Sequence, residues 1–181
     1  NIVYVGTSNI ELKRMYTIGE DKSELSDVIV KYFALKKKWD YMSYISHNRY
    51  TPGDFINHWI KKFELGENFE IVFNELGQGV SLYIDGKLLA DQGHGVTQLL
   101  TILINIEIAI LQSICKKSQE NKDEEYIGTN KDDFYPQTVI LEEPEIHLHP
   151  RFQSLLADMF RQAYSSYNVQ FIIETHSEYL I

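Results

Sequence analysis

The chain has 181 residues, of which 44% are hydrophobic, and this composition is typical of a globular domain rather than a disordered chain. The formal net charge of -9 excludes a protein that binds nucleic acid through bulk positive charge, although it still allows a local basic patch. A single cysteine, Cys115, excludes an internal disulfide framework and fits a cytoplasmic protein. No uninterrupted apolar run of about 18 residues occurs, so we expect no membrane span.

The amino-terminal third predicts one strand followed by a helical insertion. Residues Ile2 to Val5 are β-branched or aromatic, which favours a short strand. From Ser26 to about Ile45, apolar side chains recur at spacings of three and four, which predicts an amphipathic helix. Thr51 and Pro52 indicate the start of a second helix, with Thr51 as N-cap and Pro52 in the first turn. We assign residues 20–66 to this insertion.

Residues 69–90 predict an antiparallel meander. Phe69 to Phe73 and Val80 to Ile84 alternate in the manner of strands, and Asp85-Gly86 is typical of a type I′ hairpin turn. A loop with the sequence Gly93-His94-Gly95 then leads to a long helix, expected from Thr97 to about Lys117. Its two apolar stripes leave little polar surface, so we expect it to be buried on most sides.

The carboxy-terminal third predicts a parallel strand–helix–strand unit. Ser118 to Asp133 is polar and should form an exposed loop. The apolar runs Thr138 to Leu141 and Val169 to Ile173 are typical of buried parallel strands, and Pro150 begins the helix between them. Ligands of such sheets bind at the carboxyl ends of the strands.

Ionisable side chains follow both strands at that edge. Glu142-Glu143-Pro144-Glu145 follows the first strand, and Glu174-Thr175-His176-Ser177 follows the second. Unpaired carboxylates are costly to desolvate, so their presence at two core strand ends suggests a function. Neighbouring strand residues point to opposite sides, so we expect Glu142 to hold Mg2+ through its hydration shell and Glu143 to polarise an attacking water. His176 would hydrogen-bond to a transferred phosphoryl group.

Three alternatives remain open at this point. The acids can be structural, capping helices or pairing with Arg151 and Arg161. A metal-dependent hydrolase or nuclease would bind Zn2+ or Mn2+ through a histidine–carboxylate set, unless the histidine before Pro150 only caps the following helix. A non-catalytic module would bind nucleic acid or a partner through a basic patch, unless the lysines are only the solvated side of their helix. The hydrolase set is Glu143, Glu145, His147 and His149, and the basic patch is Lys36, Lys37 and Lys38 with Trp39, Tyr41 and Tyr44.

The stretch TVILEEPEIHLHP, with FIIETHSEYL after it, resembles the Walker B, D-loop and switch-histidine regions of ABC-type ATPases. The likeness is greatest to bacterial ATPases of the AAA type related to the overcoming-lysogenization-defect (OLD) group and to SMC-like proteins. The resemblance implies that Glu143 is the general base, Glu142 the acid on the Mg2+ side and His176 the γ-phosphate sensor. The D-loop, which crosses the subunit interface in that family, would contain Glu145, His147 and His149.

Asp91 to Leu100 resembles the degenerate ABC signature of the same family. Glycines permit close approach of backbone amides, and a helix N-terminus favours an anion. The resemblance implies that this segment contacts the ATP held by the opposite subunit. The residues concerned are Gly93, His94, Gly95, Thr97 and Gln98.

No G-x-x-x-x-G-K-[ST] segment occurs in the sequence. We therefore expect the carboxy-terminal lobe of a longer ATPase, a single partial domain (1–181) with little activity in isolation. The expected fold is an α/β P-loop NTPase (ABC-type) lobe with a largely parallel core sheet, an antiparallel meander and a helical insertion. Residues 91–181 would hold the signature, Walker B, D-loop and switch histidine. The resemblance implies a homodimer that uses Mg2+ with ATP, and it raises DNA or a nuclease as a further partner in DNA repair or phage defence.

Overall fold

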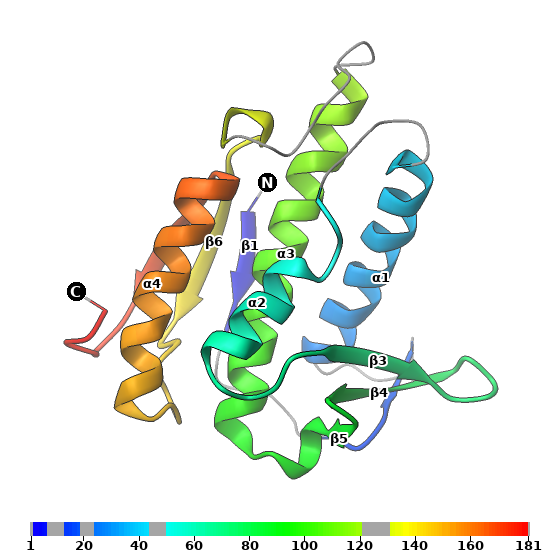
Figure 1. Cartoon of the computed structure of the whole chain (residues 1–181), viewed down its shortest axis with the longest axis horizontal. Coiled ribbons are helices and arrows are strands. Elements are labelled where there is room, and N and C mark those ends of the chain that lie inside the picture. Colours follow the sequence, from blue (N-terminus) through cyan, green and yellow to red (C-terminus); the bar gives the residue numbers. More distant parts are fainter. Residues whose placement is uncertain (1, 7–12, 19–23, 44–49, 121–130, 181) are drawn as a thin grey trace.

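Two sheets and four α-helices make up the part of the chain that this computed structural model describes, residues 2–6, 13–18, 24–43, 50–120 and 131–180 (Figure 1). The parallel sheet has the order β1-β6-β7, and the antiparallel sheet has the order β2-β4-β3 with β5 paired to β4. The strands are β1 (Ile2–Val5), β2 (Tyr16–Thr17), β3 (Phe69–Phe73), β4 (Gly79–Ile84), β5 (Lys87–Leu88), β6 (Gln137–Glu142) and β7 (Val169–Glu174). The helices are α1 (Glu24–Ser43), α2 (Asp54–Lys62), α3 (His94–Glu120) and α4 (Pro150–Tyr167). The α/β architecture predicted from the sequence is confirmed.

The parallel sheet has one covered face and one open face. Alternate residues such as Val5, Leu141 and Val169 are buried on the side where α3 and α4 pack. On the other face the strand register aligns Tyr4, Ile140 and Ile172 in one row, and both Tyr4 and Ile172 are more than half exposed. The next row toward the carboxyl ends pairs Glu142 with Glu174. The acids therefore share a sheet face with exposed apolar side chains.

Helix α3 is the central element of the core. Every residue from Leu99 to Leu111 is buried, as its two apolar stripes predict. Two of the polar members of this stretch, Thr101 and Asn105, donate their side-chain hydrogen bonds back to carbonyls of the same helix. The segment His94–Lys117 is long and apolar enough to cross a membrane, but 94% of its apolar window is buried inside the protein. This burial is that of a core helix.

A buried carboxylate on α3 holds the start of α2. Glu107 Oε2 accepts a hydrogen bond from the Tyr50 hydroxyl at 2.7 Å, and Glu107 Oε1 accepts one from the Gly53 amide at 2.9 Å. Burial raises the pKa of Glu107 to about 7, and these hydrogen bonds oppose the shift without cancelling it. The predicted start of α2 at Thr51 and Pro52 is wrong. The N-cap is Gly53 with φ 98°, which has no side chain, so the remote Glu107 binds the amide at the helix start instead.

Most other predicted elements are found with shifted ends. Helix α1 covers the predicted span, although Ile45 lies outside the described residues. Asp85 and Gly86 have φ values of 47° and 72°, as a type I′ turn requires. Helix α3 begins at His94 rather than Thr97, and it extends to Glu120. Residues 121–130 of the predicted polar loop lie outside the described residues.

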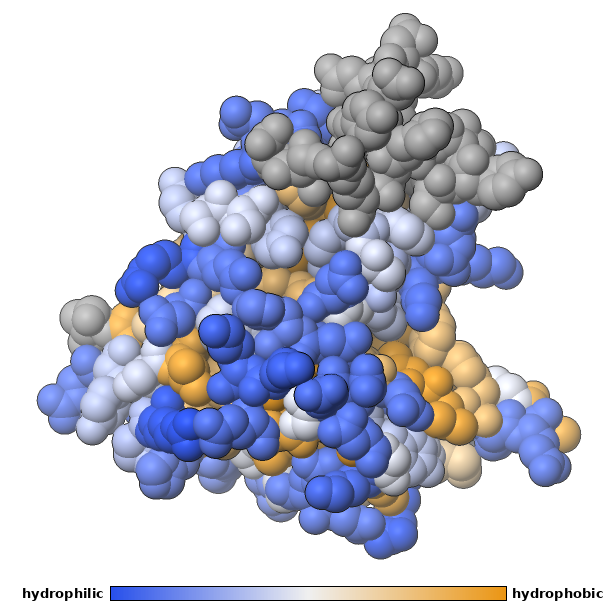
Figure 2. Space-filling view, viewed as in Figure 1, coloured by the Kyte–Doolittle hydropathy of each residue, from blue (hydrophilic) through white to orange (hydrophobic). Residues whose placement is uncertain are grey.

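Apolar side chains are exposed where the β3–β4 hairpin extends away from the helices (Figure 1). Val72, Phe73 and Leu76 are exposed there, with Leu76 at 79%. Figure 2 shows apolar residues gathered on this side of the molecule, beside a mostly hydrophilic front. Phe73 also packs against Phe33 of α1, with 4.6 Å between ring centroids, so the hairpin is anchored on the helical insertion.

Candidate functional site

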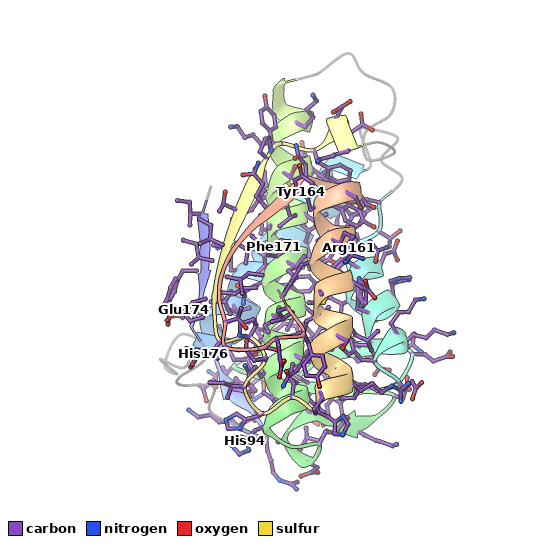
Figure 3. The ribbon with its side chains drawn as sticks, turned by 90° about the vertical axis from the view of Figure 1, so that its left-hand side faces the viewer. His94, Arg161, Tyr164, Phe171, Glu174 and His176 are labelled. Carbon is purple, nitrogen blue, oxygen red and sulfur yellow. The ribbon has the colours of Figure 1, made fainter. Side chains whose placement is uncertain are left out.

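Glu143 and His176 lie side by side where β6 and β7 end. His176 Nε2 is 3.6 Å from Glu143 Oε1, and the two side chains are 83% and 38% exposed. The Glu143 amide donates a hydrogen bond to the Glu174 carbonyl at 2.7 Å, so the two loops leave the sheet together. Figure 3 shows Glu174 and His176 at the carboxyl end of β7, with His94 beyond them. The expected proximity of the glutamate and the histidine is confirmed.

The backbone of Glu143 has a left-handed conformation, with φ 43°. This conformation is uncommon outside glycine and is frequently found at functional sites. Strand β6 ends at Glu142, the residue before this change of conformation. The two adjacent glutamates consequently have different neighbours: Glu142 stays in register with Glu174, whereas Glu143 faces His176.

Glu174 lies at the candidate site, although sequence reasoning assigned it no role. Its register pairing with Glu142 places both residues on one sheet face at the carboxyl ends of the strands. The signal was present in the sequence, because each of these glutamates is the last residue of one of two neighbouring parallel strands. Together they offer four carboxylate oxygens, which are the donors that Mg2+ prefers.

Glu145 is buried and accepts hydrogen bonds from residues of its own chain. Its Oε1 accepts hydrogen bonds from the Thr175 hydroxyl at 2.7 Å and from the His176 amide at 2.8 Å. Burial alone would raise the pKa of Glu145, but the hydrogen bonds from Thr175 and from nearby backbone amides outweigh it and hold the pKa below its ordinary value. Glu145 therefore joins the loop after β6 to the loop after β7.

The histidine–carboxylate metal site is not formed. Across the described ranges, no three His, Cys, Asp or Glu side chains are grouped so that they could hold a metal ion. His149 instead caps α4: its Nδ1 accepts a hydrogen bond from the Arg151 amide at 3.3 Å, and Pro150 occupies the first turn. Glu145 and His149 are engaged in this way, so the alternative of a Zn2+ or Mn2+ site with Glu143 and His147 is not supported.

The alternative in which the acids at the strand ends pair with Arg151 and Arg161 is also wrong. Arg151 pairs with Glu64, and Arg161 pairs with Asp158 within α4. Neither ion pair involves the acids at the strand ends.

The residues of the predicted signature divide into an exposed and a buried set at the start of α3. Gly93, with φ 92°, and His94 are exposed, and the His94 ring lies 6.1 Å from that of His147. Thr97 and Gln98 are buried. The Thr97 hydroxyl donates to the Gly93 carbonyl at 3.2 Å, which closes the first turn of the helix.

This helix start packs directly on the turn that carries Glu143. Gln98 Nε2 donates to the carbonyls of Glu143 and Pro144 at 3.4 and 3.3 Å. A Cβ atom on Gly95 would lie 2.6 Å from the His147 carbonyl oxygen, so only glycine permits this approach. In the described structure Gly95 and Gln98 thus support the loop after β6, and their contact with nucleotide stays a prediction.

The lysines of α1 lie beside a partly buried tryptophan. Trp39 packs against the core, whereas Lys37, Lys38 and Tyr41 are exposed, and Tyr44 lies outside the described residues. This placement agrees with a solvated helix surface. Nucleic-acid binding by the patch remains a prediction.

Residues 17–181 match the family model of the AAA ATPase domain. No curated protein sequence matches the chain. The match includes the meander, the start of α3 and both strand ends, and it accords with the α/β P-loop NTPase fold expected from the sequence. The chain therefore belongs to the AAA ATPase domain family, a family of domains that bind and hydrolyse ATP.

Proposed function

We propose that this chain supplies the signature and Walker B side of an ABC-type, OLD-like ATPase that binds and hydrolyses ATP as a homodimer. The observation that carries the proposal is the 3.6 Å approach of His176 Nε2 to Glu143 Oε1 at the carboxyl ends of two parallel strands. Both side chains reach solvent there, so a nucleotide and a water can approach them. The residue types and their placement suit phosphoryl transfer to water.

Glu143 is the proposed general base and His176 the proposed phosphate sensor. A carboxylate accepts the proton that an attacking water loses as it bonds to phosphorus. An imidazole N–H at the neighbouring strand end donates a hydrogen bond to a phosphoryl oxygen and stabilises the charge that develops on it. The hydrogen bond from the Glu143 amide to the Glu174 carbonyl fixes the two strand ends relative to each other.

Glu142 and Glu174 fit Mg2+ in the manner usual for nucleotide sites, where one or two carboxylates act together with phosphates and waters. When bound, Mg2+ neutralises charge on the β- and γ-phosphates. We assign Glu142, half-buried in register with Glu174, as the principal acid on the Mg2+ side.

The exposed N-terminus of α3 is the basis for proposing a dimer. Gly93 and His94 are exposed at the N-terminus of a 27-residue helix, where the helix dipole favours an anion such as the γ-phosphate held by a partner. No phosphate-loop motif occurs in the 181 residues, so the amides and the lysine that hold β- and γ-phosphates belong to another segment of polypeptide. A cytoplasmic role in DNA repair or phage defence, with DNA or a nuclease as partner, is proposed from the resemblance alone.

The test is ATP turnover by the full-length protein with Glu143→Gln, compared with the wild type. Glutamine keeps the size of the side chain but cannot accept the proton, so turnover should fall by about 10²- to 10⁴-fold while ATP binding is retained. Glu178→Gln is the matched control, because Glu178 is an exposed carboxylate on the loop after β7. Unimpaired turnover in Glu143→Gln would remove Glu143 as the base.

A further inference from the structure

Glu145 begins a continuous set of hydrogen bonds through both loops of the site. The Thr175 hydroxyl, which donates to Glu145 Oε1, also accepts a hydrogen bond from the Ser177 amide at 3.0 Å. The Ser177 hydroxyl donates to Gln153 Oε1 of α4 at 2.7 Å, and Gln153 Nε2 donates to the Leu148 carbonyl at 3.0 Å. The series therefore starts and ends in the loop after β6, and it passes through the loop after β7 and through α4.

The place of His176 depends on this arrangement because its own side chain is largely exposed. An imidazole that is 83% exposed has few packing contacts to fix it, so its position follows from that of its backbone. The His176 amide donates to Glu145 Oε1 at 2.8 Å, and the residues on both sides of His176 belong to the same hydrogen-bonded series. Since Glu145 lies two residues after Glu143, it connects the base directly to the sensor loop.

We propose that Glu145 is a positioning residue that holds His176 against Glu143, rather than a residue that reaches across the dimer interface. The proposal rests on the proposed function for its catalytic consequence. Its structural content, that Glu145 fixes the backbone of the loop at His176, does not depend on ATP hydrolysis.

The geometry at Glu145 makes the role testable with a conservative substitution. Both hydrogen bonds go to a single oxygen, Oε1. The other oxygen, Oε2, is buried and has no hydrogen-bond partner among the residues that the structure describes. Glutamine retains an acceptor in the Oε1 position while it removes the charge and places an amide NH2 group at the Oε2 position, whereas leucine removes both oxygens with little change in side-chain size.

The experiment compares Glu145→Gln and Glu145→Leu in the full-length protein, with Glu178→Gln as the control on the same loop. Hydrogen exchange of the His176 amide, measured by NMR without nucleotide, should be about tenfold faster or more in Glu145→Leu and close to wild type in Glu145→Gln. With ATP, kcat should fall by about 10²-fold in Glu145→Leu with little change in KM, because a displaced group costs rate rather than binding. Glu145→Gln should retain most of kcat.

Two results would overturn the proposal. Unchanged exchange at His176 in Glu145→Leu would show that Glu145 does not hold the loop. Equal loss of kcat in both variants, with the His176 amide still protected in Glu145→Gln, would show that the charge of Glu145 matters rather than its hydrogen bonds.

Two further measurements cover the cases in which Glu145→Leu does not fold or the wild type does not hydrolyse ATP. If Glu145→Leu does not fold, Thr175→Val keeps the shape of the side chain but removes the donor to Glu145 and the acceptor for the Ser177 amide. It leaves the hydrogen bond from the His176 amide to Glu145, so it should give an intermediate exchange rate; no change would count against the proposal. A wild-type protein without ATP turnover would refute the proposed function, and exchange at His176 would then decide the role of Glu145 alone.

Discussion

Replacing Glu107 by glutamine should remove a large part of the pH dependence of folding stability. The Glu107 carboxyl is fully buried on α3, and its pKa of about 7 lies well above the ordinary value of 4.5. Between these two values the folded chain keeps a proton that the unfolded chain loses. The free energy of unfolding must therefore fall as the pH rises from about 4.5 to about 7, and this group causes no further change above that range.

The size of the effect follows from the same two pKa values. A difference of about 2.5 pKa units corresponds to about 3 kcal/mol of stability lost across the window. Glutamine has the same shape and can still accept the hydrogen bond from the Gly53 amide, but it stays neutral at every pH. The stability of the wild type relative to Glu107→Gln should thus decline by about 3 kcal/mol between pH 4.5 and 8.

Urea unfolding of both proteins at several pH values, followed by circular dichroism, measures this difference. Comparing wild type with variant cancels the contribution of the other acidic groups. Glu70→Gln on β3 is the control, because that carboxylate is exposed and its substitution should give a constant difference. Parallel stability curves for wild type and Glu107→Gln would refute the assignment of a costly buried charge at this position.

Two other substitutions test the packing around the site. Gly95→Ala should destabilise the protein by about 1–3 kcal/mol in urea unfolding, because the new Cβ would lie 2.6 Å from the His147 carbonyl oxygen. Alanine favours helices by up to about 1 kcal/mol, so a stabilised variant would contradict this close approach. His149→Ala should lower the urea midpoint by an amount equivalent to about 1 kcal/mol, through loss of the hydrogen bond from the Arg151 amide. An unchanged midpoint would show that His149 contributes nothing as a cap.

Periodic patterns in the sequence predicted the elements that position the site. The stripes of α3 and the apolar runs of β6 and β7 are strong local signals, and they gave the correct type for each element. Because neighbouring parallel strands end at one edge of a sheet, those patterns were sufficient to predict that Glu143 and His176 lie close together, as they do. That step required no knowledge of side-chain packing.

The features that sequence reasoning missed depend on contacts between distant segments. The start of α2 is fixed by Glu107, which lies 54 residues from Gly53 in the chain, so the local N-cap signal at Thr51 was misleading. The hydrogen bond that Glu145 accepts from Thr175, 30 residues away in the chain, likewise has no local signal in the sequence. Strand β2 has two residues, too few for any periodic pattern.

The left-handed turn at Glu143 has a consequence for how two identical acids acquire different chemistry. A regular strand would place consecutive side chains on opposite faces of the same sheet, each among its own cross-strand neighbours. Here the backbone rotates between Glu142 and Glu143, which removes the second carboxylate from the pleated surface altogether. A local change of backbone conformation can therefore give two adjacent glutamates different surroundings without any change in their covalent structure.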